Sequence, residues 1–348
     1  MIIDRIPLSP PPVLPLKGSE DRPLWSVMIP VYNCGNYLPQ ALRSILMQDP
    51  GPELMQIEVI DDCSTDIDVE ELVGSIGRGR IRYYRQPENV GSLRNFETCL
   101  NRSRGQWVHL LHGDDYLSPG FYEEIADLFL AYPEAGAAFT GYYQVKADGE
   151  LLYPNPTLSE KPGYVDNWMD IVGQSQPLQP PAVVVKRAVY ERLGSFFGMQ
   201  YGEDWEMWVR ISASFPVVHS PRRLANYRVH TTGISSRCFQ NGENIKDICR
   251  AIDIVQTHLA PEKRRQMKKL ARKNFSMYFA RTADMVYHGY RSPARAMRQA
   301  ISALRMSVNA VTLYYVLKIG LKILIRYRFG QIGKPAGTGS SFIRKITF

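Results

Sequence analysis

Three short acidic stretches stand at points where apolar runs of the sequence end. They are the pairs Asp61-Asp62, Asp114-Asp115 and Glu203-Asp204. Carboxylates next to a protein core are unfavourable unless a cation, a hydroxyl donor or a proton transfer makes use of them. Their positions therefore predict a site that combines a metal ion, a nucleotide and proton-transfer chemistry.

The elements that must position these acids follow from the apolar runs. Residues 26–33, 56–60 and 107–111 are short, β-branched or apolar, and stop abruptly at polar turns, as buried parallel strands do. Each is followed by apolar residues at helical spacing, so strand, turn and helix alternate. Right-handed crossovers bring the carboxyl ends of such strands to one edge of the sheet. We therefore expect these side chains to converge: Tyr32, Asp61, Asp62, Asp114 and Asp115.

The chain divides into an acidic front and a basic back. From residue 261 onward there are 19 Lys and Arg against 2 Asp and Glu, whereas residues 1–260 contain 23 against 32. We predict a Pro-rich, extended arm over 1–23, an α/β domain over 24–240 and a basic helical region over 241–348. The arm lacks the apolar segment of a secretory signal. The basic region favours an anionic partner such as a membrane surface, and we expect no nucleic-acid partner.

No segment reads as an uninterrupted membrane-spanning helix. The best candidate, residues 311–329, carries Lys318, Lys322 and Arg326 at every fourth position, which makes one positive stripe on an apolar helix. The pattern suits a helix in a membrane interface with its cations toward the headgroups. It equally suits a helix packed on the domain with its cations in water.

The cysteines indicate the compartment. Five are present, an odd number with no C-x-x-C pair, so neither a disulfide framework nor a zinc ribbon is indicated. We expect a reducing cytoplasm, with a peripheral position on the inner face of the cell membrane as an option that the basic region leaves open.

Six motifs, in order and in approximate spacing, resemble the family 2 inverting glycosyltransferases with a GT-A fold, over roughly residues 24–238. They are Ser26-Val27-Met28-Ile29-Pro30-Val31-Tyr32-Asn33, Val59-Ile60-Asp61-Asp62-Cys63-Ser64-Thr65-Asp66, Asn89-Val90-Gly91 with Arg94-Asn95, His112-Gly113-Asp114-Asp115, Gly202-Glu203-Asp204 and Tyr227-Arg228-Val229-His230. The resemblance implies an α/β fold with a mixed, mostly parallel sheet flanked by helices. The basic C-terminal region lies beyond it.

The resemblance also implies site residues. Asp115 would bind a divalent cation, Mn²⁺ or Mg²⁺, that neutralises the donor diphosphate, and Asp114 a ribose hydroxyl. Many members have an acid two residues before Asp114, where this chain has His112. The remaining donor-site residues implied are Pro30, Tyr32, Asp61, Asp62, Arg94 and His230.

Asp204 is the expected general base, with Glu203 as the competing candidate. An inverting transfer needs a side chain that takes the proton of the acceptor hydroxyl, and a carboxylate does so at neutral pH. Trp205 beside it suits a core position better than stacking on an acceptor sugar.

Structural alternatives stay open for each of these residues. Residues 61–66 also suit a turn with a helix cap, and Asp114-Asp115 a loop before a helix. For Asp204 the alternative is a surface helix start, for His230 a structural contact, and for Arg94 a solvated cation.

The expected function is an inverting, metal-dependent hexosyltransferase. It would move a hexose from a nucleotide sugar, with UDP favoured over guanine and thymine nucleotides, to a hydroxyl of a glycan or lipid-linked glycan in bacterial-type surface polysaccharide synthesis. A sugar-phosphate nucleotidyltransferase is disfavoured because the turn at residues 32–36 lacks the expected Gly-rich loop with Arg and Lys. The non-enzymatic alternative is a sugar-nucleotide or glycan-binding module tethered to a membrane.

Overall fold

The computed structural model describes residues 4–16 and 22–327, which form two compact units. Of the described residues, unit 1 comprises 4–16, 22–169 and 177–230, and unit 2 comprises 170–176 and 231–327. The division thus falls after His230 rather than at residue 240, because α8 (Ile234–Asn241) packs with the helices that follow it.

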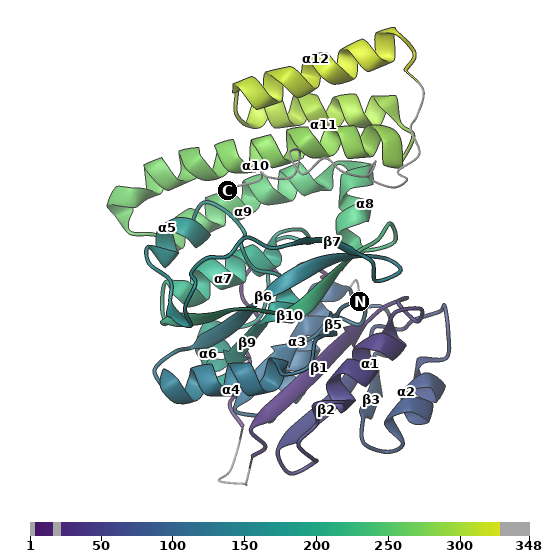
Figure 1. The fold of residues 1–348 in the computed structure, drawn as a ribbon, viewed down its shortest axis with the longest axis vertical. Helices are drawn as coiled ribbons and strands as arrows, with labels where there is room; N and C mark the ends of the chain where they lie inside the picture. Colours follow the sequence, from purple (N-terminus) through teal and green to yellow (C-terminus); the bar gives the residue numbers. More distant parts are fainter. Residues whose placement is uncertain (1–3, 17–21, 328–348) are drawn as a thin grey trace. The chain divides into compact units, whose positions relative to one another are not determined.

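Unit 1 is built on one mixed sheet. Its strands follow the order β3-β2-β1-β4-β9-β6-β10-β5, with β7 beside β6 and β8 beside β10 (Figure 1). The strands β1, β2, β3 and β4 are parallel, as are β6 and β10, whereas β9 is antiparallel to both β4 and β6. The strands are β1 (Trp25–Val31), β2 (Met55–Asp61), β3 (Arg82–Arg85), β4 (Trp107–Leu110), β5 (Tyr116–Leu117), β6 (Ala137–Lys146), β7 (Leu151–Pro154), β8 (Gly163–Tyr164), β9 (Val183–Lys186) and β10 (Val217–Val229).

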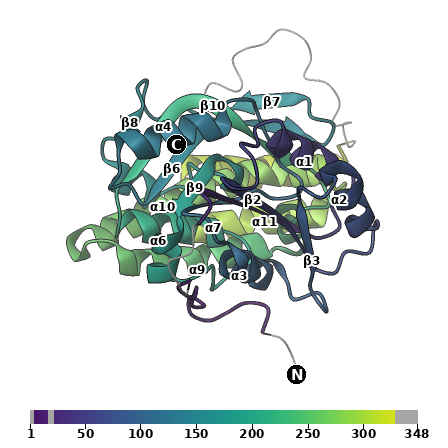
Figure 2. The same cartoon turned by 90° about the horizontal axis from the view of Figure 1, so that it is seen from below.

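Helices cover both faces of this sheet. Figure 2 shows α1 (Leu38–Leu46) and α4 (Phe121–Ala131) on one side and α3 (Ser92–Arg102) on the other. Val27, Ile29 and Val31 of β1 pack with the apolar side chains of α1 and α4 in one core cluster. The predicted mixed sheet flanked by helices is therefore confirmed. The other helices assigned wholly to unit 1 are α2 (Val69–Gly77), α6 (Arg187–Leu193), α7 (Glu203–Ser212) and the 3₁₀ turn η1 (Pro180–Ala182), and α5 (Trp168–Val172) spans the junction of the two units.

A buried histidine in β4 makes the stability of unit 1 sensitive to acid. His109 is fully buried, with Nε2 3.1 Å from the carbonyl oxygen of Pro181 and its ring stacked on Phe121 at 4.9 Å. Burial lowers the pKa of His109 from 6.5 to about 3. In mild acid His109 is therefore protonated in the unfolded chain but not in the folded one. The free energy of unfolding falls as the pH drops below the pKa of this histidine in the unfolded chain.

We expect His109→Gln to flatten this dependence. Below pH 6.5, protonation of His109 in the unfolded chain lowers the free energy of unfolding of the wild type by about 1.4 kcal/mol for each pH unit. Glutamine does not titrate, so this contribution is absent from the variant. Urea unfolding between neutral pH and mild acid measures the two slopes. Other buried histidines act equally in both proteins, so identical slopes would show that His109 is not the group responsible.

Unit 2 is a helical bundle. Besides α8 it contains α9 (Glu243–His258), α10 (Pro261–Gly289), α11 (Pro293–Met306) and α12 (Ala310–Leu324). Ala283, Val286, Ala300 and Ile319 form part of the small core that joins α10, α11 and α12. Asn309 starts α12 with a capping box, because its side chain accepts from Val311 and Thr312.

The expectation for residues 311–329 requires a correction. Both alternatives for this helix placed the three cations of the stripe outward. Two of them, Lys318 and Lys322, instead turn toward α10 and bind the two carboxylate oxygens of Asp284, at 2.8 and 2.5 Å, whereas Arg326 is exposed. Asp284 is one of only two acids after residue 260, and it offers these ammonium groups a half-buried partner. Residues 328 and 329 lie outside the described part. In that part, no helix combines the length and apolarity needed to span a bilayer.

Candidate functional site

The loop after β4 carries the second acidic pair and runs along the end of β1. The backbone N–H of Gly113 donates to the carbonyl oxygen of Pro30 at 3.2 Å. A Cβ at position 113 would lie 2.8 Å from Cys34 Sγ and 3.0 Å from Val31 Cγ2, so only glycine lets this loop approach the strand. The close approach fixes Asp114 and Asp115 at the carboxyl edge of the sheet.

Asp115 is almost fully buried and only half satisfied. Its side chain accepts a hydrogen bond from the backbone N–H of Arg228 through Oδ1, at 2.8 Å. Oδ2 is buried and has no hydrogen-bond partner among the described residues. Burial, and then the charge of Asp114, raise the pKa of Asp115 well above its ordinary value. A buried carboxylate oxygen without a donor, beside a second carboxylate, fits a divalent cation.

The two neighbours of Asp115 could complete such a site. His112, Asp114 and Asp115 each offer one ligand atom, and these atoms lie within 4.8 Å of one another. The ring of His112 stacks on Phe96, with centroids 5.2 Å apart, and burial lowers the pKa of His112. The imidazole is therefore held neutral, as a metal ligand must be. His112 thus stands where an acid would complete a D-x-D triplet.

Asp114 is paired with a histidine from the end of β10. His230 Nε2 lies 2.8 Å from Asp114 Oδ2, and the His230 ring packs against Tyr37 with centroids 4.8 Å apart. Burial opposes ionisation of Asp114, but the hydrogen bond from His230 and the influence of His112 outweigh it, so that the pKa of Asp114 is lowered. The structure therefore brings His230, one of the expected donor-site residues, to the second acidic pair.

Arg228 supports this pair, and the sequence analysis gave it no role. It is buried, with Nε donating to the carbonyl oxygen of Asp114 at 2.7 Å and Nη2 to Gln40 Oε1 at 2.6 Å. Its guanidinium lies over the rings of Tyr37 and Tyr116. Arg228 positions the loop with backbone and side-chain bonds together. The one available signal was a charged residue within the strand end at 224–229.

The first acidic pair, at the end of β2, accepts hydrogen bonds from the neighbouring strand and loops. Asp61 Oδ2 accepts from Arg85 at 2.6 Å and from the hydroxyl of Tyr83 at 2.9 Å, while Oδ1 accepts from the backbone of Ser64. Asp61 is thus fully engaged by the protein.

Asp62 binds the loop before α3. Its carboxylate accepts from the backbone N–H groups of Val90 and Gly91, at 2.7 and 2.9 Å, and from the Asn89 amide. Burial raises the pKa of Asp62, although the two backbone bonds oppose the shift. In this structure Asp62 therefore shapes residues 89–91 rather than presenting a free carboxylate.

The two acidic pairs lie within electrostatic reach of one thiol. Burial raises the pKa of Cys34, which follows β1, and the charges of Asp114, Asp66 and Asp61 raise it further. Tyr32, two residues earlier, is exposed at this edge, whereas Pro30 is buried in β1. The convergence expected from the strand order is thus observed for residues from β1, β2 and β4.

The N-terminal arm reaches the same region. Arg94 Nε donates to the carbonyl oxygen of Asp4 at 2.8 Å, and its Nη1 pairs with Glu97. Arg5 Nη2 donates to the carbonyl oxygen of Asn89 at 2.6 Å. Further along the arm, the carbonyl oxygen of Pro7 accepts from Gly198 at 2.8 Å. The arm therefore links the loop that Asp62 holds to the segment before α7.

Asp204 is the second residue of α7, which begins at Glu203 after Gly202, whose positive φ of 92° ends the preceding loop. Asp204 Oδ1 accepts from the backbone of Trp205, and Trp205 itself is fully buried, which confirms its core role. Phe196 in the loop before α7 contacts Phe96, the ring on which His112 stacks. Aromatic contacts thus connect the segment before α7 with His112 of the acidic group.

This geometry agrees with a family match. Residues 26–194 match the family described as Glycosyl transferase family 2. The chain carries a family 2 glycosyltransferase domain.

Relatives of this glycosyltransferase domain include enzymes and solved structures. Chondroitin synthase of Pasteurella multocida (strain Pm70) is 28% identical over 155 residues, which are 44% of this chain but only 16% of that protein. S. aureus TarS 1-349 in complex with UDP-GlcNAc has a TM-score of 0.59 at 14% identity, covering 89% of this chain and 98% of that one. Mannosyltransferase PcManGT from Pyrobaculum calidifontis, in complex with GDP-Man and Mn²⁺, has a TM-score of 0.50 at 16% identity, covering 93% and 91%. The last two support the shared GT-A fold.

The contacts of the arm predict a role for Arg5 in this glycosyltransferase. Arg5→Ala removes the hydrogen bond to the carbonyl oxygen of Asn89. Asn89 directly precedes Val90, whose backbone N–H donates to Asp62. We expect the nucleotide of the sugar donor to bind about three- to tenfold more weakly, the effect of one exposed charged hydrogen bond. Calorimetry with UDP and Mn²⁺ measures the change.

The matched control is Arg22→Ala. Arg22 also bonds backbone carbonyl oxygens, those of Arg104 and Gly105, but does so beside the start of β4. It should bind UDP like the wild type. Equal affinities for both variants would mean that the arm does not support the nucleotide loop.

Proposed function

We propose that the protein is an inverting, metal-dependent hexosyltransferase that uses a UDP-sugar donor. One observation supports the proposal most: the buried, unpartnered Oδ2 of Asp115, beside His112 and Asp114, at the carboxyl edge of a family 2 domain. Asp115, Asp114 and His112 would hold the ion. A bound Mn²⁺ or Mg²⁺ would neutralise the diphosphate and so favour its departure.

Residues of this chain would handle the remaining tasks. His230 donates to Asp114 and fixes the direction of that carboxylate. Asp62 shapes the loop 89–91, from which the base and ribose would be held, and Tyr32 offers an exposed ring at the same edge. Asp204 would accept the proton of the attacking hydroxyl, which increases the nucleophilicity of that oxygen.

Neighbours and relatives guide the substrate classes. The TarS complex contains UDP-GlcNAc, which favours UDP over GDP as the leaving group, although PcManGT binds GDP-Man. Chondroitin synthase, a relative over part of its length, favours a glycan or lipid-linked glycan hydroxyl as the acceptor, in surface polysaccharide synthesis. All five cysteines are free thiols, which supports a cytoplasmic location.

A donor screen tests the proposal. We expect release of UDP from one or more UDP-hexoses in the presence of Mn²⁺ or Mg²⁺, abolished by EDTA and restored by added ion. Nuclear magnetic resonance of the product should show an inverted anomeric configuration. Tight UDP binding without turnover on any donor or acceptor would favour the non-catalytic binding module instead.

A further inference from the structure

The outer face of α12 is apolar and unusually exposed. Leu317, Leu321 and Leu324 are 71%, 58% and 80% exposed, and their spacing places them on one side of the helix. Val308, just before the helix, is 73% exposed. A soluble surface rarely presents such a contiguous row of leucines without a partner.

The cations of α12 do not interrupt this face. Lys318 and Lys322 bind Asp284 of α10, and the opposite side of α12 buries Ile319 in the bundle core. The helix is thus anchored by its polar and inner residues. Its leucines are left as an uncharged outer row, which we call the leucine face (Leu313, Leu317, Leu321 and Leu324).

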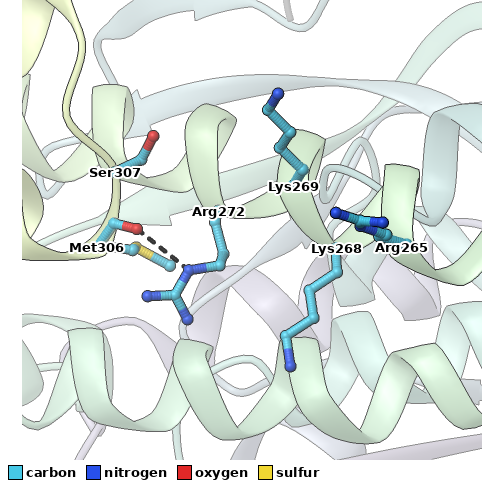
Figure 3. Close-up of a pocket in the computed structure, with 6 residues that line it drawn as sticks. All are labelled: Arg265, Lys268, Lys269, Arg272, Met306 and Ser307. Carbon is cyan, nitrogen blue, oxygen red and sulfur yellow. Dashed lines mark hydrogen bonds between the residues drawn. The ribbon is translucent and has the colours of Figure 1, made fainter.

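A cationic pocket lies next to the start of α12. It has a volume of about 340 Å³, and the six described residues that line it include no acid. Figure 3 shows four long cationic side chains of α10 around it, with Met306 and Ser307 closing one side. Arg272 donates to the carbonyl oxygen of Met306 at 3.1 Å, so this wall is fixed. The four cations are Arg265, Lys268, Lys269 and Arg272.

The pocket and the leucine face are continuous along the chain. Ser307 lines the pocket, Val308 is exposed, and Asn309 caps α12. Lys268 pairs with Asp253 at 2.6 Å, and the residues Arg265 and Lys269 are exposed. An apolar row, followed along the chain by a pocket lined with cations that suit phosphate groups, matches the two layers of a lipid surface.

We propose that this surface docks on an anionic lipid bilayer, with the leucine face among the acyl chains and lipid phosphates at the pocket. Charge excludes the other occupants. A second copy that docked through the same surface would bring the same cations to the same place, and residues 328–348 contain Arg and Lys but no acid that could neutralise the pocket. The inference concerns unit 2 alone and is independent of the proposed transferase activity.

Vesicle sedimentation of the full chain tests the leucine face. The wild type should bind vesicles of phosphatidylcholine with 30% phosphatidylglycerol at least tenfold more tightly than phosphatidylcholine alone. Leu317→Glu with Leu321→Glu should lose this binding at least tenfold. Both leucines are exposed, so the double variant should fold and keep the melting temperature of the wild type. The matched control Leu130→Glu changes a leucine of α4 that is 74% exposed and should bind vesicles like the wild type.

The pocket has its own test. Arg265→Glu with Lys269→Glu should remove the preference for anionic vesicles, and free inorganic phosphate at millimolar concentration should not compete. Unchanged vesicle binding in either double variant overturns the proposal. So does loss of binding on truncation after Tyr327, or light scattering that shows a dimer dissociated by the leucine substitutions.

Discussion

Asp115→Asn should lower the rate of sugar transfer about a thousandfold or more, equivalent to about 4 kcal/mol of transition-state stabilisation. The amide keeps an oxygen for the N–H of Arg228, which Asp115 Oδ1 now accepts at 2.8 Å. It removes the charged oxygen that has no partner among the described residues. Transfer assays with saturating donor and Mn²⁺ measure the loss.

Thermal unfolding separates this effect from misfolding. Mn²⁺ with UDP should raise the melting temperature of the wild type and not that of Asp115→Asn. Without metal the variant should be at least as stable as the wild type, because burial raises the pKa of Asp115 and makes its ionised form unfavourable. Asp127→Asn, an exposed acid of α4, is the control. A variant that retains transfer, or its metal-dependent stabilisation, would rule out Asp115 as a ligand.

The parts of the site that lie within strand-turn segments were predictable. Apolar runs placed β1, β2 and β4, and parallel order brought Asp61 and Asp114 to the same edge, where both raise the pKa of Cys34. Period and topology suffice for such residues because the strand itself determines where its last side chain lies.

Partners chosen by tertiary contact were not predictable. Arg94 binds Asp4, 90 positions away, and Arg228 binds Gln40, 188 positions away. The direction in which the lysines of α12 point depends on Asp284. The spacing of Lys318 and Lys322 predicts that they share one face of the helix, but it does not predict which acid they bind. Local patterns fix which residues share a face, whereas the direction of that face depends on the rest of the fold.

Asp204→Asn should lower kcat by about a hundredfold to ten-thousandfold, the range for loss of a general base. UDP binding should stay within about twofold of the wild type, because Asp204 lies at the start of α7 and is expected to act on the acceptor rather than the donor. The asparagine keeps an oxygen for the N–H of Trp205, so the first turn of the helix should be preserved.

Glu203→Gln is the matched control, since Glu203 precedes Asp204 in the same turn. It should change kcat by less than about fivefold if Asp204 is the base. The wild-type rate should fall at acid pH as the base is protonated, and this limb should disappear in Asp204→Asn. If Glu203→Gln instead loses both the activity and the fall in rate at acid pH, Glu203 and not Asp204 is the general base. Because successive helical residues point about 100° apart, only one of them can face the attacking hydroxyl, so the pair of variants decides which carboxylate receives the proton.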